Sequence, residues 1–428
     1  MKGSVINMRR SAACLGAALA AVTLTAGCGN NGVSTSSGGV VQLSMLTGFT
    51  GPDEPAYQAL VAEFNKTHPD IHVTMTVEPW ATVAQKLPAS WATGAGPDLA
   101  TPSSDPGSIF SYIKTNSVLP LDSAVGSADG KIDAGAFPSA VRDAFTVDGK
   151  LYAVPANMAT LALYYNKDMF TAAGISNPPA TQDDFVADAK KLTVSSGGTV
   201  SQYGLSLADN QTIQMWPILQ WMNGGDIVDG HGCAVVNSAA SVSALTKWSQ
   251  LVIQNHISPI GQSGADADTL FASRKAAMEI NGPWAAAGYK SAGINLGIAE
   301  VPVGPAGPIT LASTVPLMIE RNTPHAAQAE QFLAWYTGKT AQAQFSQSSG
   351  FPPARTDLGD AVAANPTVAL FAKALPYAKL YLAGQPQATS IDTDVYIPMI
   401  QQIERGANVK SAADSAAQKI NQLTGCKS

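Results

Sequence analysis

The chain has 428 residues, of which 46% are hydrophobic and 13% charged, and its formal net charge at pH 7 is −6. This composition supports a large buried core and argues against intrinsic disorder, while an acidic balance argues against binding of nucleic acid, which needs a basic surface. No stretch beyond the N-terminal segment reaches the ~18 apolar residues of a transmembrane helix. After that segment about 400 residues remain, enough for two ordinary domains.

The N-terminus has the order of a secretory signal. The basic residues Lys2, Arg9 and Arg10 precede an apolar run, Ala12–Ala26. Because this run is shorter than the ~20 residues of a membrane span, a cleaved export signal is favoured over a transmembrane helix. Removing three basic residues and no acidic ones changes the formal net charge from −6 to −9.

Cys28 follows the apolar run directly and resembles the lipid-bearing cysteine of a bacterial lipoprotein signal. Thr25 stands where such signals usually have leucine. The resemblance implies that residues 1–27 are removed and that Cys28 becomes an N-terminus carrying lipid, palmitate included. The alternative is an ordinary signal with an incidental cysteine. Residues 28–39 are rich in Gly and Ser and predict a flexible tether.

Two further cysteines, Cys233 and Cys426, remain in the mature chain. Export places them in an oxidising compartment, where thiols pair. We therefore predict a disulfide that fixes the C-terminal helix to the body of the protein. The alternative is two buried or unpaired thiols.

The first elements after the tether form a βαβ pattern. Val40–Leu46 is predicted to be a strand, and Asp53 is placed to cap the helix that follows. Apolar residues from Tyr57 to Phe64 recur at helical spacing, and Ile71–Val77 alternates apolar and polar residues as a strand does. A strand, helix and strand within about 40 residues predict a parallel sheet.

Strands and helices continue along the rest of the chain, and the part from Thr367 onward is predicted to contain helices only. The predicted strands are Leu151–Val154, Thr160–Tyr165, Ala276–Ile280, Leu296–Val301 and Ile309–Ile319. The predicted helices are Asp183–Leu192, Trp216–Met222, Ala239–Gln254 and His325–Tyr336. This mixture is typical of an α/β protein.

Sequence motifs of common catalytic and metal sites are absent. The chain has no HExxH, no GxSxG and no P-loop lysine. His68 and His72 are four residues apart, but Pro69 separates them, so no metal site is predicted. A glycoside hydrolase needs two carboxylates across a cleft, and no pair here has a local signature.

Five segments of the chain resemble, in the same order, motifs of one family. They are Gly96–Leu99 with Ser104-Asp105, Asp148–Pro155 with Leu163–Phe170, Trp216-Pro217 with Gly224-Gly225, Ala276–Trp284, and Gly350–Arg355. On these motifs the chain is identified as a member of the extracellular solute-binding proteins of ABC importers. It is most similar to the carbohydrate-binding branch, which includes maltose-binding and glycerol-phosphate-binding proteins.

The resemblance implies an α/β, two-lobe, periplasmic-binding-protein-like fold. Ligand would bind in a cleft between the lobes, which close over it by hinge motion. Since the chain of such proteins crosses between lobes more than once, each lobe is expected to comprise separate stretches. We expect residues 40–157 and 313–365 in lobe 1, and residues 158–312 and 366–428 in lobe 2.

Trp284 and Asp105 are the strongest candidates for ligand contact that the resemblance implies. A sugar presents a C–H face that stacks on aromatic rings and hydroxyls that need polar partners. Trp284 holds the position of a sugar-stacking tryptophan, and Asp105 that of an aspartate that accepts hydrogen bonds from hydroxyls. The alternatives are a core tryptophan and a helix N-cap, since Pro106 follows Asp105.

Other ligand-binding candidates lie in loops that face the cleft in the family. Arg355 stands where glycerol-phosphate-binding relatives place a phosphate-contacting arginine, with a surface arginine as the alternative. Met158 to Thr160 replace a stretch that carries an acidic ligand residue in maltose-binding protein, which argues against maltose. The remaining candidates are Gly48, Phe49, Glu78, Trp80, Ser104, Gln211, Gln214, Ser313 and Asp392.

The function implied is capture of a carbohydrate, a disaccharide or oligosaccharide, and its delivery to the membrane subunits of an ABC permease. The protein is expected to be a monomer without cofactor, metal or catalytic activity. A lipid anchor would hold it at the extracellular face of the cytoplasmic membrane. A glycerophosphodiester or glycerol phosphate is the alternative ligand, and a secreted glycoside hydrolase is the third hypothesis.

Overall fold

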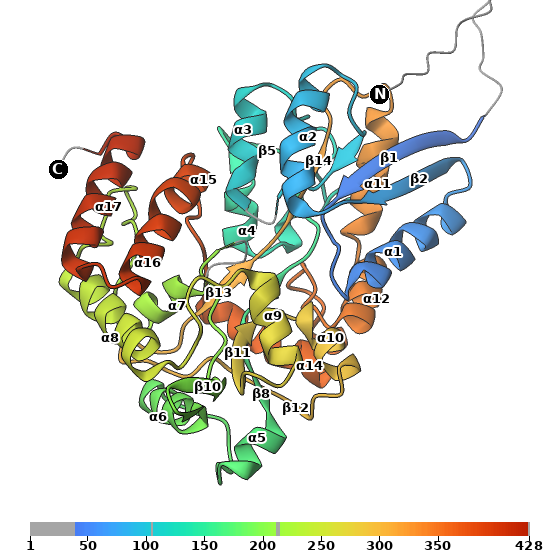
Figure 1. Ribbon diagram of the computed structural model, residues 1–428. Coiled ribbons are helices and arrows are strands. Elements are labelled where there is room, and N and C mark those ends of the chain that lie inside the picture. Colours follow the sequence, from blue (N-terminus) through green and yellow to red (C-terminus); the bar gives the residue numbers. More distant parts are fainter. Residues whose placement is uncertain (1–38, 104–105, 211–214, 427–428) are drawn as a thin grey trace, which may run out of the picture. The chain divides into compact units, whose positions relative to one another are not determined.

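The computed structural model describes residues 39–103, 106–210 and 215–426 (Figure 1). The predictions for Cys28, Ser104, Asp105, Gln211 and Gln214 therefore lie outside the described residues. Residues 40–428 form one unit of the chain. No helix in the described part is long and apolar enough to cross a membrane.

The predicted βαβ unit is confirmed. Strands β1 (Val41–Thr47) and β2 (Ile71–Val77) pair in parallel along their whole length. The connecting helix α1 (Glu54–Thr67) buries its apolar face, including Tyr57 and Phe64, under the sheet. Asp53 occupies the N-cap position of α1, but its side chain makes no capping hydrogen bond, so the predicted capping role is wrong.

The first sheet has the strand order β2-β1-β3-β14-β6. Strand β3 (Leu99–Ala100) pairs with β1 in parallel, whereas β14 (Pro316–Ile319) runs antiparallel to β3 and to β6 (Val154–Pro155). Helices α1, α2 (Trp80–Ala92) and α11 (Ala326–Tyr336) pack against this sheet (Figure 1). Segments far apart in the sequence therefore complete one sheet.

Two further three-stranded sheets lie later in the chain. One has the order β11 (Met278–Asn281), β8 (Ala162–Asn166) and β12 (Leu296–Ala299), and all its pairs are antiparallel. The other joins β13 (Thr310–Ser313) in parallel to β15 (Ala378–Leu380) and antiparallel to β7 (Ala159–Thr160). The expected parallel arrangement thus applies to only part of the molecule, and β15 contradicts the prediction of helices only after Thr367.

Three predicted strands are each divided in two in the structure. Thr160–Tyr165 becomes β7 and β8, Leu151–Val154 becomes β5 (Lys150–Leu151) and β6, and Ile309–Ile319 becomes β13 and β14. The halves pair with different partners because the chain changes sheets there. At the last break Asn157 holds the crossing: its carbonyl accepts from Thr314 Oγ1 (2.8 Å) and its Oδ1 from Val315 N (3.2 Å).

The remaining elements surround these sheets. The other helices are α3 (Ile109–Lys114), α4 (Ser139–Ala144), α5 (Lys167–Ala172), α6 (Gln182–Leu192), α7 (Trp216–Trp221), α8 (Ala239–Asn255), α9 (Gly264–Ala272), α10 (Ala285–Ser291), α12 (Lys339–Ser349), α13 (Gly359–Ala363), α14 (Pro366–Ala374), α15 (Ala388–Ser390), α16 (Ile397–Glu404) and α17 (Val409–Thr424). Short 3-10 turns are η1 (Pro106–Ser108), η2 (Ala134–Ala136) and η3 (Leu375–Tyr377), and η4 (Ile391–Tyr396) is a π-helix. Two hairpins pair β4 (Thr146–Val147) with β5, and β9 (Val194–Ser196) with β10 (Thr199–Gln202).

Buried apolar side chains form two large clusters, each drawn from two stretches of the chain. The first takes its members from residues 43–159 and 312–354. The second takes its members from residues 161–311 and 382–420. A smaller third cluster includes Tyr164, Phe271 and Tyr289. Each of the two large clusters is therefore a separate hydrophobic core, covered by its own layers of sheet and helix.

The first family motif has a structural role at the edge of the first cluster. Asp98 accepts hydrogen bonds from the backbone N–H (2.8 Å) and hydroxyl (2.7 Å) of Ser44 in β1 and from Thr323 Oγ1 (2.5 Å). Although burial opposes ionisation, these hydrogen bonds hold the pKa of Asp98 below its usual value. The carboxylate therefore joins β1, the start of β3 and the segment before α11.

Cys233 and Cys426 form a disulfide, with their Cα atoms 5.4 Å apart. Hydrogen bonds from Ala234 N to Asn421 Oδ1 (2.8 Å) and from Asn237 Nδ2 to Asp414 Oδ1 (2.9 Å) join the same two segments. Helix α17 is thus fixed to the loop before α8 at several points.

Removing this disulfide, in the double variant Cys233→Ser/Cys426→Ser, is expected to lower the free energy of unfolding by about 2–4 kcal/mol. The physical reason is that the bond closes a long loop in the unfolded chain, since the two residues are 193 positions apart. Urea unfolding measures the difference. Dithiothreitol should shift the wild-type midpoint to that of the variant and leave the variant unchanged; equal midpoints without reductant would contradict the prediction.

Candidate ligand-binding site

Trp284 lies where all three hydrophobic clusters meet. It follows β11 and begins α10, and its half-buried ring packs against members of each cluster. The indole ring lies directly against Gly282: a Cβ atom added to Gly282 would be 2.1 Å from the ring. Phe351, of the fifth family motif, lies 6.2 Å away between ring centroids. A partly exposed tryptophan at the junction of separate cores is well placed to contact a ligand between them.

Hydrogen bonds fix the backbone that carries Trp284. The Gly282 carbonyl accepts from the hydroxyl of Tyr164 in β8 (2.6 Å), and the Gly282 N–H donates to Asn281 Oδ1 (2.8 Å). Asn281 Nδ2 in turn donates to Asp268 Oδ1 (2.7 Å) of α9. The position of the indole is therefore set by three elements and not by its loop alone.

The buried Glu279 and the half-buried Asp268 share a hydrogen-bond partner in this network. Glu279 of β11 is 0% exposed, and its Oε2 accepts a hydrogen bond from the Tyr289 hydroxyl, which also lies 2.9 Å from Asp268 Oδ1. Burial, and then the charge of Asp268, raise the pKa of Glu279 well above its usual value. Burial therefore favours the neutral, protonated form of Glu279.

The stability of the protein should consequently fall in alkali through Glu279. A carboxyl whose pKa is raised by folding contributes stability that is fully present below its unfolded pKa of ~4.3 and is lost as pH rises through the folded value. Glu279→Gln keeps a neutral side chain, so its melting temperature should fall less between pH 6 and pH 9 than that of the wild type. Glu63→Gln, at a partly exposed position, is the control; equal pH slopes in all three proteins would contradict this assignment.

A cavity of about 200 Å³ lies beside Trp284. Its wall brings together the start of α1, the start of α10 and the end of α12. The lining residues are Pro52, Asp53, Pro55, Ala56, Ala59, Trp284, Ala287, Ser348 and Ser349. Burial, together with the charge of Glu54, raises the pKa of the Asp53 carboxyl to about 6. The sequence pattern assigned Asp53 to the helix cap and did not reveal its place in this wall, although Asp53 lies in the loop that follows a parallel strand, where α/β proteins bind ligands.

The predicted residues of the first strand-to-helix loop form an aromatic group in the first cluster. Phe49 is 4% exposed, stacks on Tyr57 with centroids 3.8 Å apart, and meets the edge of Trp80. A Cβ atom at Gly48 would lie 2.1 Å from the Trp80 ring. Phe49 therefore uses its ring faces for packing, while the half-buried Trp80 retains some exposed surface.

The other predicted residues that the structure describes lie apart from the cavity wall. Glu78 pairs with Lys86 at 2.8 Å, and Ser313 is buried in β13 opposite Ala159. Asp392, in η4, accepts a hydrogen bond from the Tyr381 hydroxyl (2.7 Å). The preceding helix α15 lies against η1, which directly follows the predicted Ser104 and Asp105 in the sequence.

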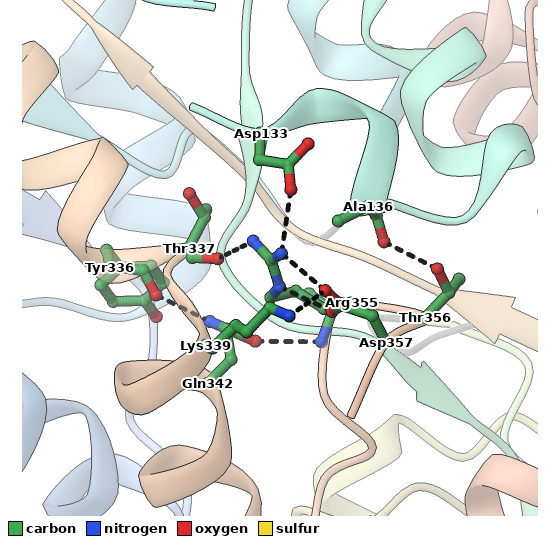
Figure 2. A network of polar contacts seen from close by, with 10 residues as sticks. Asp133, Ala136, Tyr336, Thr337, Lys339, Gln342, Arg355, Thr356 and Asp357 are labelled. Carbon is green, nitrogen blue, oxygen red and sulfur yellow. Dashed lines mark hydrogen bonds and ion pairs between the residues drawn. The ribbon is translucent and has the colours of Figure 1, made fainter. Parts of the chain in front are cut away.

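Arg355 is engaged in an ion network of its own (Figure 2). Its guanidinium donates to Asp357 through Nε (2.9 Å), to Asp133 through Nη2 (3.0 Å) and to the Thr337 carbonyl through Nη1 (3.0 Å). Lys339 pairs with the same Asp357 at 3.0 Å. All three guanidinium nitrogens therefore already have protein partners, an arrangement that joins η2, α11 and α12.

The described residues around Trp284 combine an aromatic ring with acidic and apolar neighbours. Within residues 39–103, 106–210 and 215–426, no group of three or more His, Cys, Asp or Glu side chains is placed to hold a metal ion. The arrangement around Trp284 offers an aromatic ring, a carboxylate and apolar walls. These groups fill the requirements of a binding pocket, which is mostly apolar with a few polar groups that fix orientation.

The chain belongs to the bacterial extracellular solute-binding proteins, whose family model matches residues 50–343. A binding protein of Brucella abortus is 27% identical over 353 residues, which are 81% of this chain and 84% of that protein. A galactooligosaccharide-binding protein of Bacillus subtilis is 27% identical over 56% of each chain.

Solved structures show the same fold. The GacH receptor of Streptomyces glaucescens, solved without ligand and with acarbose, superposes with a TM-score of 0.80 at 24% identity, covering 91% of this chain and 100% of that one. UgpB of Mycobacterium tuberculosis, in complex with glycerophosphocholine, gives a TM-score of 0.77 at 21% identity, covering 90% and 98%. The fold is the two-lobe, periplasmic-binding-protein-like fold, as expected.

Proposed function

We propose that this protein is the substrate-binding component of an ABC importer and captures a carbohydrate between two lobes. Lobe 1 would comprise residues 40–157 and 313–365, and lobe 2 residues 158–312 and 366–428. The two hydrophobic clusters support this division, because the chain leaves the first at residue 159 and returns to it at residue 312. Connections of this kind act as hinges in two-lobe proteins.

The observation that carries the proposal is the position of Trp284. Its ring meets both large clusters, and the cavity beside it contains a carboxylate and small apolar side chains. An aromatic face with a polar neighbour suits the C–H face and the hydroxyls of a sugar. The binding of oligosaccharides by a family relative from Bacillus subtilis supports the same ligand class.

Capture without turnover follows from this role. The family consists of solute-binding proteins, and we propose that this member has no catalytic activity and works as a monomer without cofactor. Delivery would be to the membrane subunits of a permease. Lipid attached to Cys28, with residues 28–39 as a tether, would keep the protein at the extracellular face of the cytoplasmic membrane. Mass spectrometry of the mature N-terminus tests this part: an unmodified N-terminus would contradict it.

The ligand-contact set of this proposal is Trp284, Asp105, Ser104, Gly48, Phe49, Glu78, Trp80, Gln211, Gln214, Ser313 and Asp392. Within it, Trp284 and Trp80 have the half-buried rings that stacking needs. Arg355 is the weakest candidate, because Asp133, Asp357 and Thr337 engage its guanidinium.

A thermal-shift screen over mono-, di- and trisaccharides, with glycerophosphodiesters as a second set, tests the function. A ligand that binds only the folded protein stabilises it by RT ln(1 + [L]/Kd), about 2.7 kcal/mol at a hundredfold excess over Kd. We expect at least one carbohydrate to raise the melting temperature. A response to glycerophosphodiesters alone would favour the alternative ligand class, which the fold shared with UgpB supports; release of smaller sugars during incubation would favour the hydrolase.

A further inference from the structure

The wall of the cavity beside Trp284 offers hydrogen-bond acceptors and hardly any donors. The Ser348 and Ser349 hydroxyls both donate to the Phe345 carbonyl, at 3.1 and 2.7 Å. Ser349 Oγ also accepts from Phe351 N at 3.2 Å. The other lining side chains are proline, alanine, Asp53 and Trp284. Apart from the indole N–H, every polar hydrogen on the lining side chains is thus already used.

No cation among the described residues pairs with Asp53. The cavity wall contains no Lys, Arg or His, and among the described residues no ion pair reaches this carboxylate. The titratable groups that interact electrostatically with Asp53 are Glu54 and Tyr57 on α1 and Tyr336 on α11, and none of them carries positive charge. An uncompensated carboxylate in an apolar cavity costs stability, and such a cost is retained where a ligand makes use of it.

A sugar hydroxyl can donate to Asp53, but a positively charged nitrogen uses this wall more fully, because the wall offers little to the oxygen of a hydroxyl. A hydroxyl needs a donor for its own oxygen, whereas an ammonium group needs only acceptors, and a quaternary ammonium needs only negative charge and a π face. Trp is the aromatic side chain that attracts cations most strongly. The partial positive charge at the N-terminus of α1 opposes a cation by about half an elementary charge, which the full charge of Asp53 outweighs.

We propose that the cavity formed by Asp53, Trp284 and Ser349 receives the cationic nitrogen of the captured ligand, as an alkylammonium group. This inference rests on the proposed function and narrows its ligand class. Two sources supply the same chemistry: an amino sugar within an oligosaccharide, and the quaternary ammonium of a glycerophosphodiester. A volume of about 200 Å³ accommodates either a single sugar ring or a trimethylammonium group.

Calorimetric titration of the purified protein with matched probes tests the inference. The amine probes are the glucosamine disaccharide and glycerophosphocholine, and their neutral counterparts are the N,N′-diacetylated disaccharide and glycerophosphoglycerol. We expect one amine probe to bind at least tenfold more tightly than its counterpart. The amine probe that shows this preference identifies whether the ammonium group belongs to an amino sugar or to a glycerophosphodiester.

Two variants locate the preference in the cavity. Asp53→Asn keeps the shape of the side chain and should abolish the preference for the amine while maintaining or raising the melting temperature, since a buried charge is removed. Glu54→Gln removes an acid one position away that does not line the cavity, and should retain the preference. With glycerophosphocholine, whose quaternary ammonium does not titrate, lowering the pH from 7.5 to 5 should weaken binding by about tenfold in the wild type and leave Asp53→Asn unaffected, because the Asp53 carboxyl, with a pKa of about 6, becomes protonated.

Three outcomes separate this inference from the proposed function. Equal or tighter binding of the neutral carbohydrates, unchanged in Asp53→Asn, would overturn the ammonium assignment and leave the carbohydrate-binding function intact. Equal loss of the preference in Glu54→Gln would show a general charge effect and would also overturn it. Failure of every carbohydrate and glycerophosphodiester to bind would contradict the proposed function itself.

Discussion

Replacing Arg355 with methionine is expected to destabilise the protein by about 1.5–3 kcal/mol without changing the affinity for its ligand. The cost arises because Arg355 is 6% exposed and its loss leaves Asp357 and Asp133 without their main partner. Asp357 and Asp133 are 35% and 43% exposed, so water replaces part of what they lose, and the cost is that of the charge-assisted hydrogen bonds of the buried guanidinium, about 1.5–3 kcal/mol. Methionine preserves the apolar stem of the side chain, so the loss is assigned to the charge and its hydrogen bonds.

The pH dependence of the same network has a defined sign. The hydrogen bond from Arg355, assisted by Lys339, holds the pKa of Asp357 well below its usual value. A depressed pKa contributes stability that is present above the unfolded value of ~3.9 and is lost as pH falls through the folded value. The wild type should therefore lose more stability than Arg355→Met between pH 5 and pH 3, as measured by urea unfolding.

Arg142 provides the matched control. It pairs with its neighbour Asp143 at 3.4 Å, and both side chains are largely exposed. Surface pairs of this kind contribute little, so Arg142→Met should leave the unfolding midpoint nearly unchanged. If Arg355→Met instead retained its stability and lost ligand binding, Arg355 would be a ligand residue, and the assignment of the network in Figure 2 to stability would be wrong.

Loss of the Trp284 ring is the second large expected effect. Trp284→Ala should weaken ligand binding by about 2–4 kcal/mol, or roughly thirtyfold to thousandfold in Kd, as is usual for a central aromatic contact. Gly282→Ala should weaken binding in the same direction while keeping the tryptophan, because the added Cβ would lie 2.1 Å from the ring and displace it. Calorimetry with the carbohydrate identified by the screen measures both.

Gly297 offers a control for the glycine substitution. A Cβ atom there would also lie 2.1 Å from an aromatic ring, that of Tyr165 in β8, but this ring is not part of the cavity wall. Gly297→Ala should therefore lower the melting temperature and leave Kd unchanged. If both glycine variants changed Kd equally, the effect of Gly282→Ala would reflect general destabilisation and not the position of Trp284.

Local sequence patterns were sufficient to predict elements whose apolar residues are regularly spaced. The helical spacing from Tyr57 to Phe64 and the alternation over Ile71–Val77 gave the βαβ unit. The break within Ile309–Ile319 was not predictable in this way. Ser313 and Thr314 interrupt the apolar run only briefly, as polar residues within a strand also do, and the division depends on Asn157, whose side chain bonds to the crossing from more than 150 positions away.

Only part of the candidate site was predictable, because local sequence patterns do not show contacts between distant segments. The family motif around Trp284 marks its loop, but the network of Glu279, Tyr289 and Asp268 that supports it depends on the packing of α9 and α10 against β11. Asp53 has the residue type and position of a helix cap, and only the cavity distinguishes its role. Arg355 matched a family position, while its partner Asp133 is 222 positions away in the chain.

The most direct test of carbohydrate capture is a calorimetric titration of the wild-type protein with the best carbohydrate of the screen, followed by mass analysis of the ligand released on unfolding. We expect saturable binding at one site, binding at least thirtyfold weaker in a Trp284→Ala variant that still unfolds cooperatively, and recovery of the carbohydrate intact. Binding unaffected by Trp284→Ala, or recovery of cleaved sugar, would contradict capture of a carbohydrate at this tryptophan without turnover.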